Sequence, residues 1–382
     1  MEITKPASRP KNPRFSSGPC TKPPTWNLKR LEETALGRSH RSSIGKTKLK
    51  NAINKTKEIL GIPDEFKVGI VPASDTGAFE MAMWNLLGKK PVEMLAWENF
   101  GNAWVSDAVN QLKIDASVQT ANYGEIVNFN IVNFDNDVCF TWNGTTSGVM
   151  IGPAQTIPQD RKGLTLCDAT SAAFAMELPW DLLDATTFSW QKCLGGEGGH
   201  GVIVLSPRAI QRLKTYKPSW PLPKIFRLTK GTELIEGIFS GETINTPSML
   251  CVEDYLFSLD WAKSIGGLNG LIDRSKSNAE IISEFVENTS WLDYLARDKG
   301  NRSHTSVCLS LIDARIENLE AFIKGVVTRL ENEGVAFDIG SHREAPPGLR
   351  FWCGPTVEQS DLKSLMPWIK WAFNKELAEQ NN

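Results

Sequence analysis

Lys192 stands in a stretch of sequence that suits amine chemistry. It follows the β-rich apolar run TTFSWQ, and five glycines come within the next nine residues. Glycines allow the backbone to approach a bound ligand closely. If this lysine is buried, the loss of hydration disfavours its ammonium form, and the neutral amine can form a Schiff base with an aldehyde. Taken alone, the pattern fits a surface lysine beside a glycine-rich turn better.

Asp168 makes the reactive interpretation of Lys192 the stronger one. It ends the strand-like run LTLCD and lies 24 residues before Lys192. Pyridoxal phosphate (PLP) needs a carboxylate against its pyridine nitrogen, because the protonated ring is the electron sink of the reaction. In open α/β sheets ligand-binding groups come from the carboxyl ends of strands, where both residues are expected. Alone, Asp168 could equally cap a helix; together the pair predicts two fixed points of one PLP molecule.

The run IVPASDTGAFEMAMWNLLG predicts a strand, a small polar turn and an amphipathic helix. Free N–H groups at a helix start can bind phosphate, so the backbone amides of Asp75 and Thr76 are candidates. The Asp75 carboxylate counts against this site, and a simple helix cap at Ser74 or Asp75 remains an alternative. Further along, Trp104 could cover the pyridine ring and Thr145 could bind its 3-oxygen, although core packing is the default for any tryptophan.

Two of the four histidines are followed directly by arginine, in SHRSS and in SHREAPPGLR. Arginine offers a planar fork that binds a carboxylate or a phosphate through two hydrogen bonds. The donors His40, Arg41, His342, Arg343 and Arg350 therefore predict a substrate with more than one anionic group. For the first motif, the basic run SHRSSIGKTKLK could instead be a solvated helix face.

Length and composition are those of an ordinary globular protein. The 382 residues favour one large and one smaller domain, and the net charge of −2 excludes a global basic field for nucleic acid or an anionic membrane. No apolar run is long enough to span a bilayer, and no apolar segment follows the basic N-terminus. Seven scattered cysteines and four histidines, without a CxxC pair, predict neither a disulfide framework nor a metal site. We expect a cytoplasmic protein.

The chain alternates β-rich apolar runs with amphipathic stretches, which predicts an α/β fold around a mostly parallel sheet. The expected strands are residues 67–74, 92–99, 137–144, 164–170, 186–192 and 201–206, with helices over 78–88 and 102–114. After a proline-rich stretch at 217–224 the pattern is mainly helical, with a long helix from about 271 to 287. Strand, helix and strand then follow between 306 and 354. The polar ends, 1–13 and 378–382, are expected to be loosely held.

Nine motifs in this order resemble the phosphoserine aminotransferase family, within the class V aminotransferases of PLP fold type I. They are FSSGP (15–19), SHR (39–41), DTGAF (75–79), Trp104, NGTTSG (143–148), Asp168, WQK (190–192), INTP (244–247) and HR…LR (342–350). The resemblance implies a large PLP-binding domain, 17–266, with a mostly parallel seven-stranded sheet flanked by helices. A smaller C-terminal α+β domain, 267–382, would be joined to it by the N-terminal segment 1–16.

The resemblance also implies a role for each residue. Lys192 would form the Schiff base, Asp168 would bind the pyridine nitrogen, Trp104 would stack on the ring, and Thr145 and Gln191 would make polar contacts. Asn245 and Thr246 would reach the cofactor phosphate of the other subunit in a homodimer with active sites at the subunit interface. Arg350, with Ser17 near it, would bind the α-carboxylate, while His40, Arg41, His342 and Arg343 would hold the substrate phosphate or the glutamate side chain.

The implied reaction moves an amino group from L-glutamate to 3-phosphohydroxypyruvate, giving O-phospho-L-serine and 2-oxoglutarate in serine biosynthesis. The family also implies activity on 4-phosphohydroxy-L-threonine in pyridoxine biosynthesis. One departure is PASDTGAF (72–79), where the commonest bacterial form is similar to GGGRGQF, so an arginine at the phosphate is missing. Alternatives are an alanine–glyoxylate type transaminase, a cysteine desulfurase, or a non-catalytic homologue of the same fold.

Overall fold

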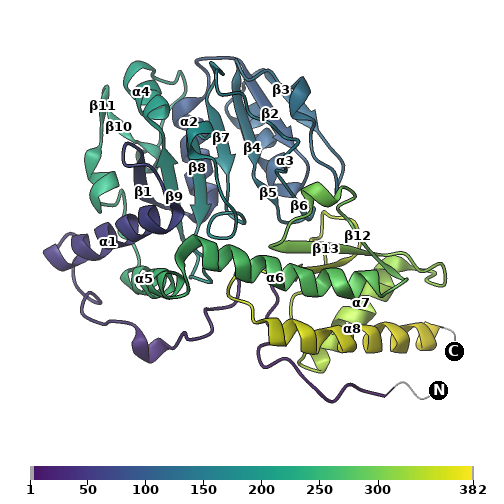
Figure 1. Cartoon of the computed structure of the whole chain (residues 1–382). Coiled ribbons are helices and arrows are strands. Elements are labelled where there is room, and N and C mark those ends of the chain that lie inside the picture. The colour runs from purple at the N-terminus through teal and green to yellow at the C-terminus, as the bar shows by residue number, and fades with distance from the viewer. Residues whose placement is uncertain (1–3, 381–382) are drawn as a thin grey trace.

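The structure is a computed structural model that describes residues 4–380, and its centre is a seven-stranded sheet (Figure 1). The order across the sheet is β1, β9, β8, β7, β4, β2, β3. Strand β9 is antiparallel to both neighbours and the other pairs are parallel, as predicted. The strands are β1 Lys67–Pro72, β2 Val92–Ala96, β3 Ala116–Thr120, β4 Asp137–Thr141, β7 Thr165–Asp168, β8 Ala185–Ser189 and β9 His200–Leu205.

The side chains of the central strands point alternately to the two faces of the sheet and belong to two apolar cores, one on each face. In β9, Val202 and Val204 belong to one core and Ile203 and Leu205 to the other. Successive side chains of a strand point to opposite faces, so a strand buried on both faces is mostly apolar. This pattern is clear in β9 (HGVIVL), whereas β8 (ATTFS) is buried throughout and yet carries the hydroxyls of Thr186, Thr187 and Ser189.

Helices cover both faces of the sheet (Figure 1). Helix α2 (Ser74–Leu86) packs on β8 and β9, and α3 (Asn99–Ser106) packs on β2. Helix α3 continues into a π-helical turn, Asp107–Gln111. The remaining helices are α1 Ser43–Leu60, α4 Pro207–Thr215, α5 Met249–Ser264, α6 Gly267–Glu287, α7 Leu319–Asn332 and α8 Gln359–Gln380. Along the described chain, none of these helices has the length and apolarity needed to cross a membrane.

The C-terminal part adds a small antiparallel sheet in the order β12, β13, β14. Its strands are Leu292–Tyr294, Ser306–Leu311 and Leu349–Trp352, and α6, α7 and α8 lie beside them (Figure 1). Helix α6 begins at Gly267, earlier than expected, directly after Gly266 with φ 103°. The domain boundary at 266/267 stays a prediction. Short hairpins complete the fold: β5 Asn143–Gly144 with β6 Val149–Met150, and β10 Thr229–Lys230 with β11 Glu233–Leu234.

The expectation of loosely held ends is wrong for the described residues. The Trp368 indole donates a hydrogen bond of 2.7 Å to the carbonyl of Ser8, and the Arg9 guanidinium lies 4.7 Å from the Trp368 ring centre. The amide of Trp352 donates to the carbonyl of Phe15 at 3.1 Å. Helix α8 continues to Gln380. Residues 1–3 and 381–382, for which the same expectation was made, lie outside the described residues.

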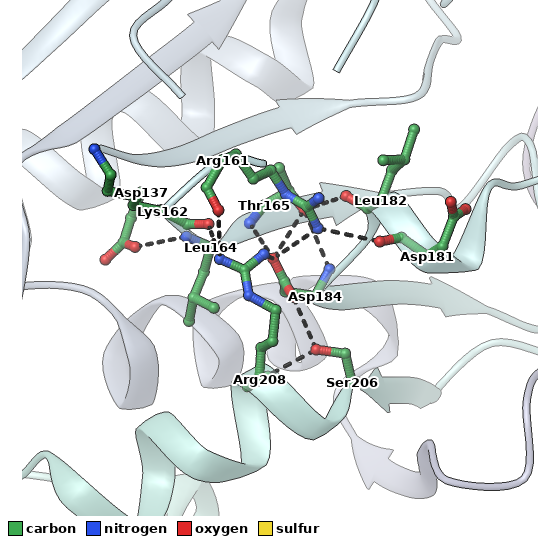
Figure 2. A network of polar contacts seen from close by, with 12 residues as sticks. Asp137, Arg161, Lys162, Leu164, Thr165, Asp181, Leu182, Asp184, Ser206 and Arg208 are labelled. Carbon is green, nitrogen blue, oxygen red and sulfur yellow. Dashed lines mark hydrogen bonds and ion pairs between the residues drawn. The ribbon is translucent and has the colours of Figure 1, made fainter. Parts of the chain in front are cut away.

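A buried polar network holds the amino-terminal ends of β7 and β8 (Figure 2). One carboxylate oxygen of Asp184 accepts from Arg161 at 3.2 Å, from Arg208 at 3.0 Å and from the amide of Thr165 at 3.0 Å. The other oxygen accepts from the Ser206 hydroxyl at 2.9 Å. Since Thr165 begins β7 and Asp168 ends it, the network fixes the strand that carries Asp168.

Candidate active site

A cavity of about 350 Å³ lies where β4, β7 and β8 end. In open α/β sheets this is the edge at which ligands bind. Seven of the predicted site residues line it: Asp75, Thr76, Trp104, Thr145, Asp168, Gln191 and Lys192. These residues are spread over more than a hundred positions of sequence, so the fold itself brings them together.

Lys192 is buried at this cavity, and its Nζ donates a hydrogen bond to the carbonyl oxygen of Ser17. Burial lowers the pKa of Lys192, and the positive charge of Arg350 acts in the same direction, against opposing effects of Cys20 and Asp168. The neutral amine is therefore favoured, as a Schiff-base lysine requires. Gly18 makes room for it, because a Cβ at Gly18 would lie 2.5 Å from Nζ.

The Asp168 carboxylate is held at both oxygens. Oδ2 accepts from the Trp104 indole N–H at 3.1 Å, and Oδ1 accepts from the amide of Thr170 at 2.9 Å. The Trp104 ring packs on Phe79, with ring centres 4.8 Å apart. Trp104, which was expected to cover the cofactor ring, is thus hydrogen-bonded to Asp168, which was expected to bind the ring nitrogen.

Asp75 lies at the start of α2, where an anion was expected. Burial, and then the negative charge of Asp168, raise its pKa well above the usual range. Two adjacent buried carboxyls cannot easily both ionise, so Asp75 is held protonated. The objection that its charge would repel a phosphate therefore loses its force. A backbone hydrogen bond of 3.0 Å from the amide of Ala73 to the carbonyl of Gly199 ties this helix start to the glycine-rich loop.

Several polar residues of the cavity were missed from the sequence. The hydroxyl of Ser171 accepts from Thr145 Oγ1 at 2.8 Å and from Asn143 Nδ2 at 2.8 Å. Ser171 follows Asp168 closely, so its place in a strand-end turn was a usable signal. Phe100 also lines the cavity, and its ring centre lies 6.0 Å from Lys192 Nζ.

The residues present fit PLP. Among the described residues, seven polar atoms of the lining are buried without a hydrogen-bond partner: Asp75 Oδ1 and Oδ2, Thr141 Oγ1, Asn143 Oδ1, Thr170 Oγ1, Ser189 Oγ and Gln191 Oε1. Buried polar groups are nearly always satisfied in folded proteins, so these atoms point to a polar ligand. The cavity volume also falls within the range of about 300–1,000 Å³ typical of small-molecule sites. No cluster of three or more potential metal-binding side chains occurs within residues 4–380.

The second His-Arg motif lies on the cavity side of the molecule. The His342 ring is 6.2 Å from the ring of Phe100. Burial, and then the charges of Arg350 and Arg343, lower the pKa of His342, so its neutral form is favoured. The Arg350 Nε is buried without a partner, whereas the Arg343 side chain is 86% exposed and lies 3.4 Å from Glu344.

Eight of the predicted residues are not in the cavity lining of the same chain: Ser17, His40, Arg41, Asn245, Thr246, His342, Arg343 and Arg350. Arg41, Asn245 and Thr246 are exposed. The charge of Arg41, together with the stronger effect of the Lys46 ion pair, lowers the pKa of Glu242. Arg41 thus lies near Glu242, three residues before Asn245.

Comparison with known proteins gives a consistent result. The chain is 55% identical over 371 residues to a phosphoserine aminotransferase of Methanosarcina barkeri, covering 97% of this chain and 99% of that protein. It is 54% identical, with the same coverage, to a phosphoserine aminotransferase of Methanosarcina mazei. A crystal structure of a phosphoserine aminotransferase from Cytophaga hutchinsonii superposes with a TM-score of 0.80 at 22% identity, covering 94% of this chain and 98% of that one. No family model matches the sequence.

Proposed function

The chain belongs to the phosphoserine aminotransferase family and is a PLP-dependent transaminase, and from this premise we propose how its residues serve the reaction. The proposed reaction moves the amino group of L-glutamate to 3-phosphohydroxypyruvate, which gives O-phospho-L-serine and 2-oxoglutarate. The observation that carries the site assignment is the burial of Lys192 in one cavity with Asp168.

When bound, PLP supplies an aldehyde that reacts with amines and a ring that stabilises negative charge at the substrate Cα. Lys192 would hold the cofactor, and its neutral amine would take the proton from Cα and pass it to the cofactor in the first half-reaction, and would move a proton in the opposite direction, to Cα, in the second. Asp168 keeps the pyridine nitrogen protonated, and the indole of Trp104 keeps that carboxylate oriented. The amides of Asp75 and Thr76 at the start of α2 bind the cofactor phosphate. Gln191 and Thr145 contact the cofactor through their polar groups.

The substrate's anionic groups meet the cationic side of the cavity. Arg350 binds the α-carboxylate, because its charge acts on Lys192 and its Nε is buried and unsatisfied. Ser17, whose buried hydroxyl also has no partner among the described residues, lies beside it. His342 binds as a neutral donor, and the exposed guanidinium of Arg343 is free to turn from Glu344 towards a phosphate.

We propose that the active enzyme is a homodimer whose cavities lie at the subunit interface. His40, Arg41, Asn245 and Thr246 do not line the cavity of their own chain, and Arg41 lies near Glu242, in the segment that leads to Asn245. A second subunit that presents this surface to the cavity would add a guanidinium for the substrate and polar groups for the cofactor phosphate. Dimer dissociation should then abolish activity without unfolding Lys192's surroundings.

We also propose 4-phosphohydroxy-L-threonine as a second amino-group partner, since the same anion-binding side chains suit both phosphorylated substrates. The proposed location is the cytoplasm. All seven cysteines are free thiols, six of them buried, which is the usual condition in a reducing compartment.

The test combines trapping and kinetics. Borohydride reduction followed by peptide mapping should label Lys192, and Lys192→Ala should remove the visible absorbance of the bound cofactor. Glutamate-dependent turnover of phosphohydroxypyruvate should exceed that of glyoxylate, and cysteine should release no sulfide. Faster turnover of glyoxylate, or sulfide release, would assign one of the related reactions instead. A label on another lysine would remove the cofactor assignment.

A further inference from the structure

Glu98 is a buried acidic residue that the reaction, as described so far, does not use. It lies between β2 and α3, and only 1% of its surface is exposed. Its carboxylate caps α3, because Oε1 accepts a hydrogen bond of 3.0 Å from the amide of Gly101. Burying a carboxylate is unfavourable unless its hydrogen bonds are satisfied, so its position calls for a reason beyond the cap.

The second oxygen of Glu98 reaches a different segment. Oε2 accepts from Thr146 Oγ1 at 2.7 Å and from the amide of Thr146 at 3.4 Å. The turn packs directly on this side chain, since a Cβ at Gly144 would lie 3.0 Å from Glu98 Cγ. One side chain therefore joins α3 to the turn of residues 143–148, which lies 48 residues away at Thr146.

Both joined segments are walls of the cofactor cavity. Helix α3 supplies Phe100 and Trp104, and the turn supplies Asn143 and Thr145. Trp104 also donates to Asp168. A shift of α3 relative to the turn would therefore change the space between the ring-covering indole and the hydroxyl of Thr145. Losses of alignment of about 1 Å in such sites can reduce rates about a hundredfold.

We propose that Glu98 is a positioning residue of the transaminase: its carboxylate, by holding α3 to the 143–148 turn, sets the geometry in which the cofactor ring is bound. The proposal rests on the proposed placement of PLP in this cavity. Glu98 itself touches neither the cofactor nor the substrate in this account. It acts through Trp104 on one side and Thr145 on the other.

The ionisation state of Glu98 gives the proposal its own signature. Burial raises the pKa of Glu98 to about 7, and the negative charge of Asp168 acts in the same direction, against the hydrogen bonds from Thr146 and Gly101. The other ionisable groups that face it are the Tyr123 hydroxyl and the Cys308 thiol, whose pKa values are both raised, so both are neutral near pH 7. Protonation removes one acceptor and the charge, and therefore loosens the contact between the two walls.

The test measures cofactor affinity of the apoprotein against pH for the wild type and for Glu98→Gln, which imitates the protonated form at every pH. At about pH 8.5 the wild type should bind the cofactor about ten times more tightly than Glu98→Gln, because the variant lacks one charged hydrogen bond. At about pH 5.5 the two affinities should be nearly equal. Taking the ratio cancels the titration of the cofactor phosphate itself. The circular dichroism of the bound cofactor should differ between the two proteins at high pH and converge at low pH.

Two further variants separate positioning from folding. Thr146→Val removes one hydrogen-bond donor to Glu98 without changing a charge, and should also lower the affinity for the cofactor. In the double variant it should lower the affinity little beyond the effect of Glu98→Gln alone. It also serves as the test if Glu98→Gln does not fold. Asn318→Ala, which removes the cap of α7 away from the cavity, should lower thermal stability and leave cofactor affinity unchanged.

A wild-type to Glu98→Gln ratio that stays constant with pH, or unchanged affinity in both Glu98→Gln and Thr146→Val, would overturn the proposal and leave Glu98 as a helix cap. The placement of the cofactor is tested separately by Lys192→Ala. If that variant keeps the visible absorbance band, the placement of PLP in this cavity is wrong, whatever the Glu98 variants show.

Discussion

Replacing Asp184 by asparagine should strongly destabilise the protein while leaving the cofactor site intact. The carboxylate accepts hydrogen bonds from Arg161, Arg208, Thr165 and Ser206 (Figure 2). The side chains of Asp184 and Arg161 are each 2% exposed, so Asp184→Asn would leave a buried guanidinium without its counter-charge. Because asparagine keeps the volume, the change tests charge and hydrogen bonding, not packing.

The expected loss is about 3 kcal/mol of unfolding free energy. Breaking a buried ion pair from one side typically costs about 3–5 kcal/mol. The lower end applies because Arg161 keeps weak hydrogen bonds of 3.4 Å to the carbonyls of Pro158 and Asp181. The side chain of Arg208 is 39% exposed, so its ion pair adds little.

Urea unfolding of the apoprotein measures this loss, and Asp135→Asn is the matched control. Asp135 pairs with Lys162 at 2.8 Å, but these side chains are 50% and 72% exposed, so that substitution should cost far less unfolding free energy than Asp184→Asn. Equal, small losses for both variants would refute the reasoning. Folded Asp184→Asn should bind PLP normally, because the network and Asp168 lie at opposite ends of β7.

Three further outcomes are expected. Gly18→Ala should push the amine of Lys192 out of place, since the new Cβ would lie 2.5 Å from Nζ; kcat should fall about a hundredfold, and the unfolding free energy should also fall, because Gly18 has a φ of 152° that disfavours a side chain. Asp75→Asn should stabilise the apoprotein at neutral pH. Folding raises the pKa of Asp75, so the unfolding free energy of the wild type falls as the pH rises above the pKa that this carboxyl has in the unfolded chain, whereas asparagine does not ionise. Thermal melts should show this advantage vanishing at acid pH, and an advantage that persists there would contradict the assignment. Arg350→Ala should raise the KM for glutamate about tenfold to a hundredfold, and unchanged steady-state kinetics would exclude Arg350 from carboxylate binding.

Much of the central sheet could be predicted because its strands are buried on both faces. Burial on both sides favours short apolar and β-branched runs, by which six of the seven strands were recognised, although β8 (ATTFS) also buries three hydroxyl side chains. Edge strand β3, ASVQT, was not predicted, since most of its side chains are exposed and it has no apolar run. The number of strands came from the family resemblance, whereas the order of the strands across the sheet was not predicted and is given only by the structure.

The N-terminal segment shows the limit of local composition most clearly. Its polar, proline-containing sequence is typical of a free end, yet Ser8 and Arg9 pack on Trp368, some 360 positions away. No local pattern marks such a contact. It exists because α8 presents an indole whose N–H needs an acceptor, and that acceptor happens to be the carbonyl of Ser8.

The sequence by itself determined which chemistry was possible: an amine at Lys192, a carboxylate at Asp168, a helix start at Asp75 and paired His-Arg donors. Only the tertiary structure decided the state of those groups. The lowered pKa of Lys192, the raised pKa of Asp75 and the hydrogen bonds that join Glu98 to Thr146 all follow from burial and from neighbours distant in sequence. Hydration and electrostatic energies depend on which segments pack together in space, and the packing of distant segments cannot be read from any single stretch of the sequence.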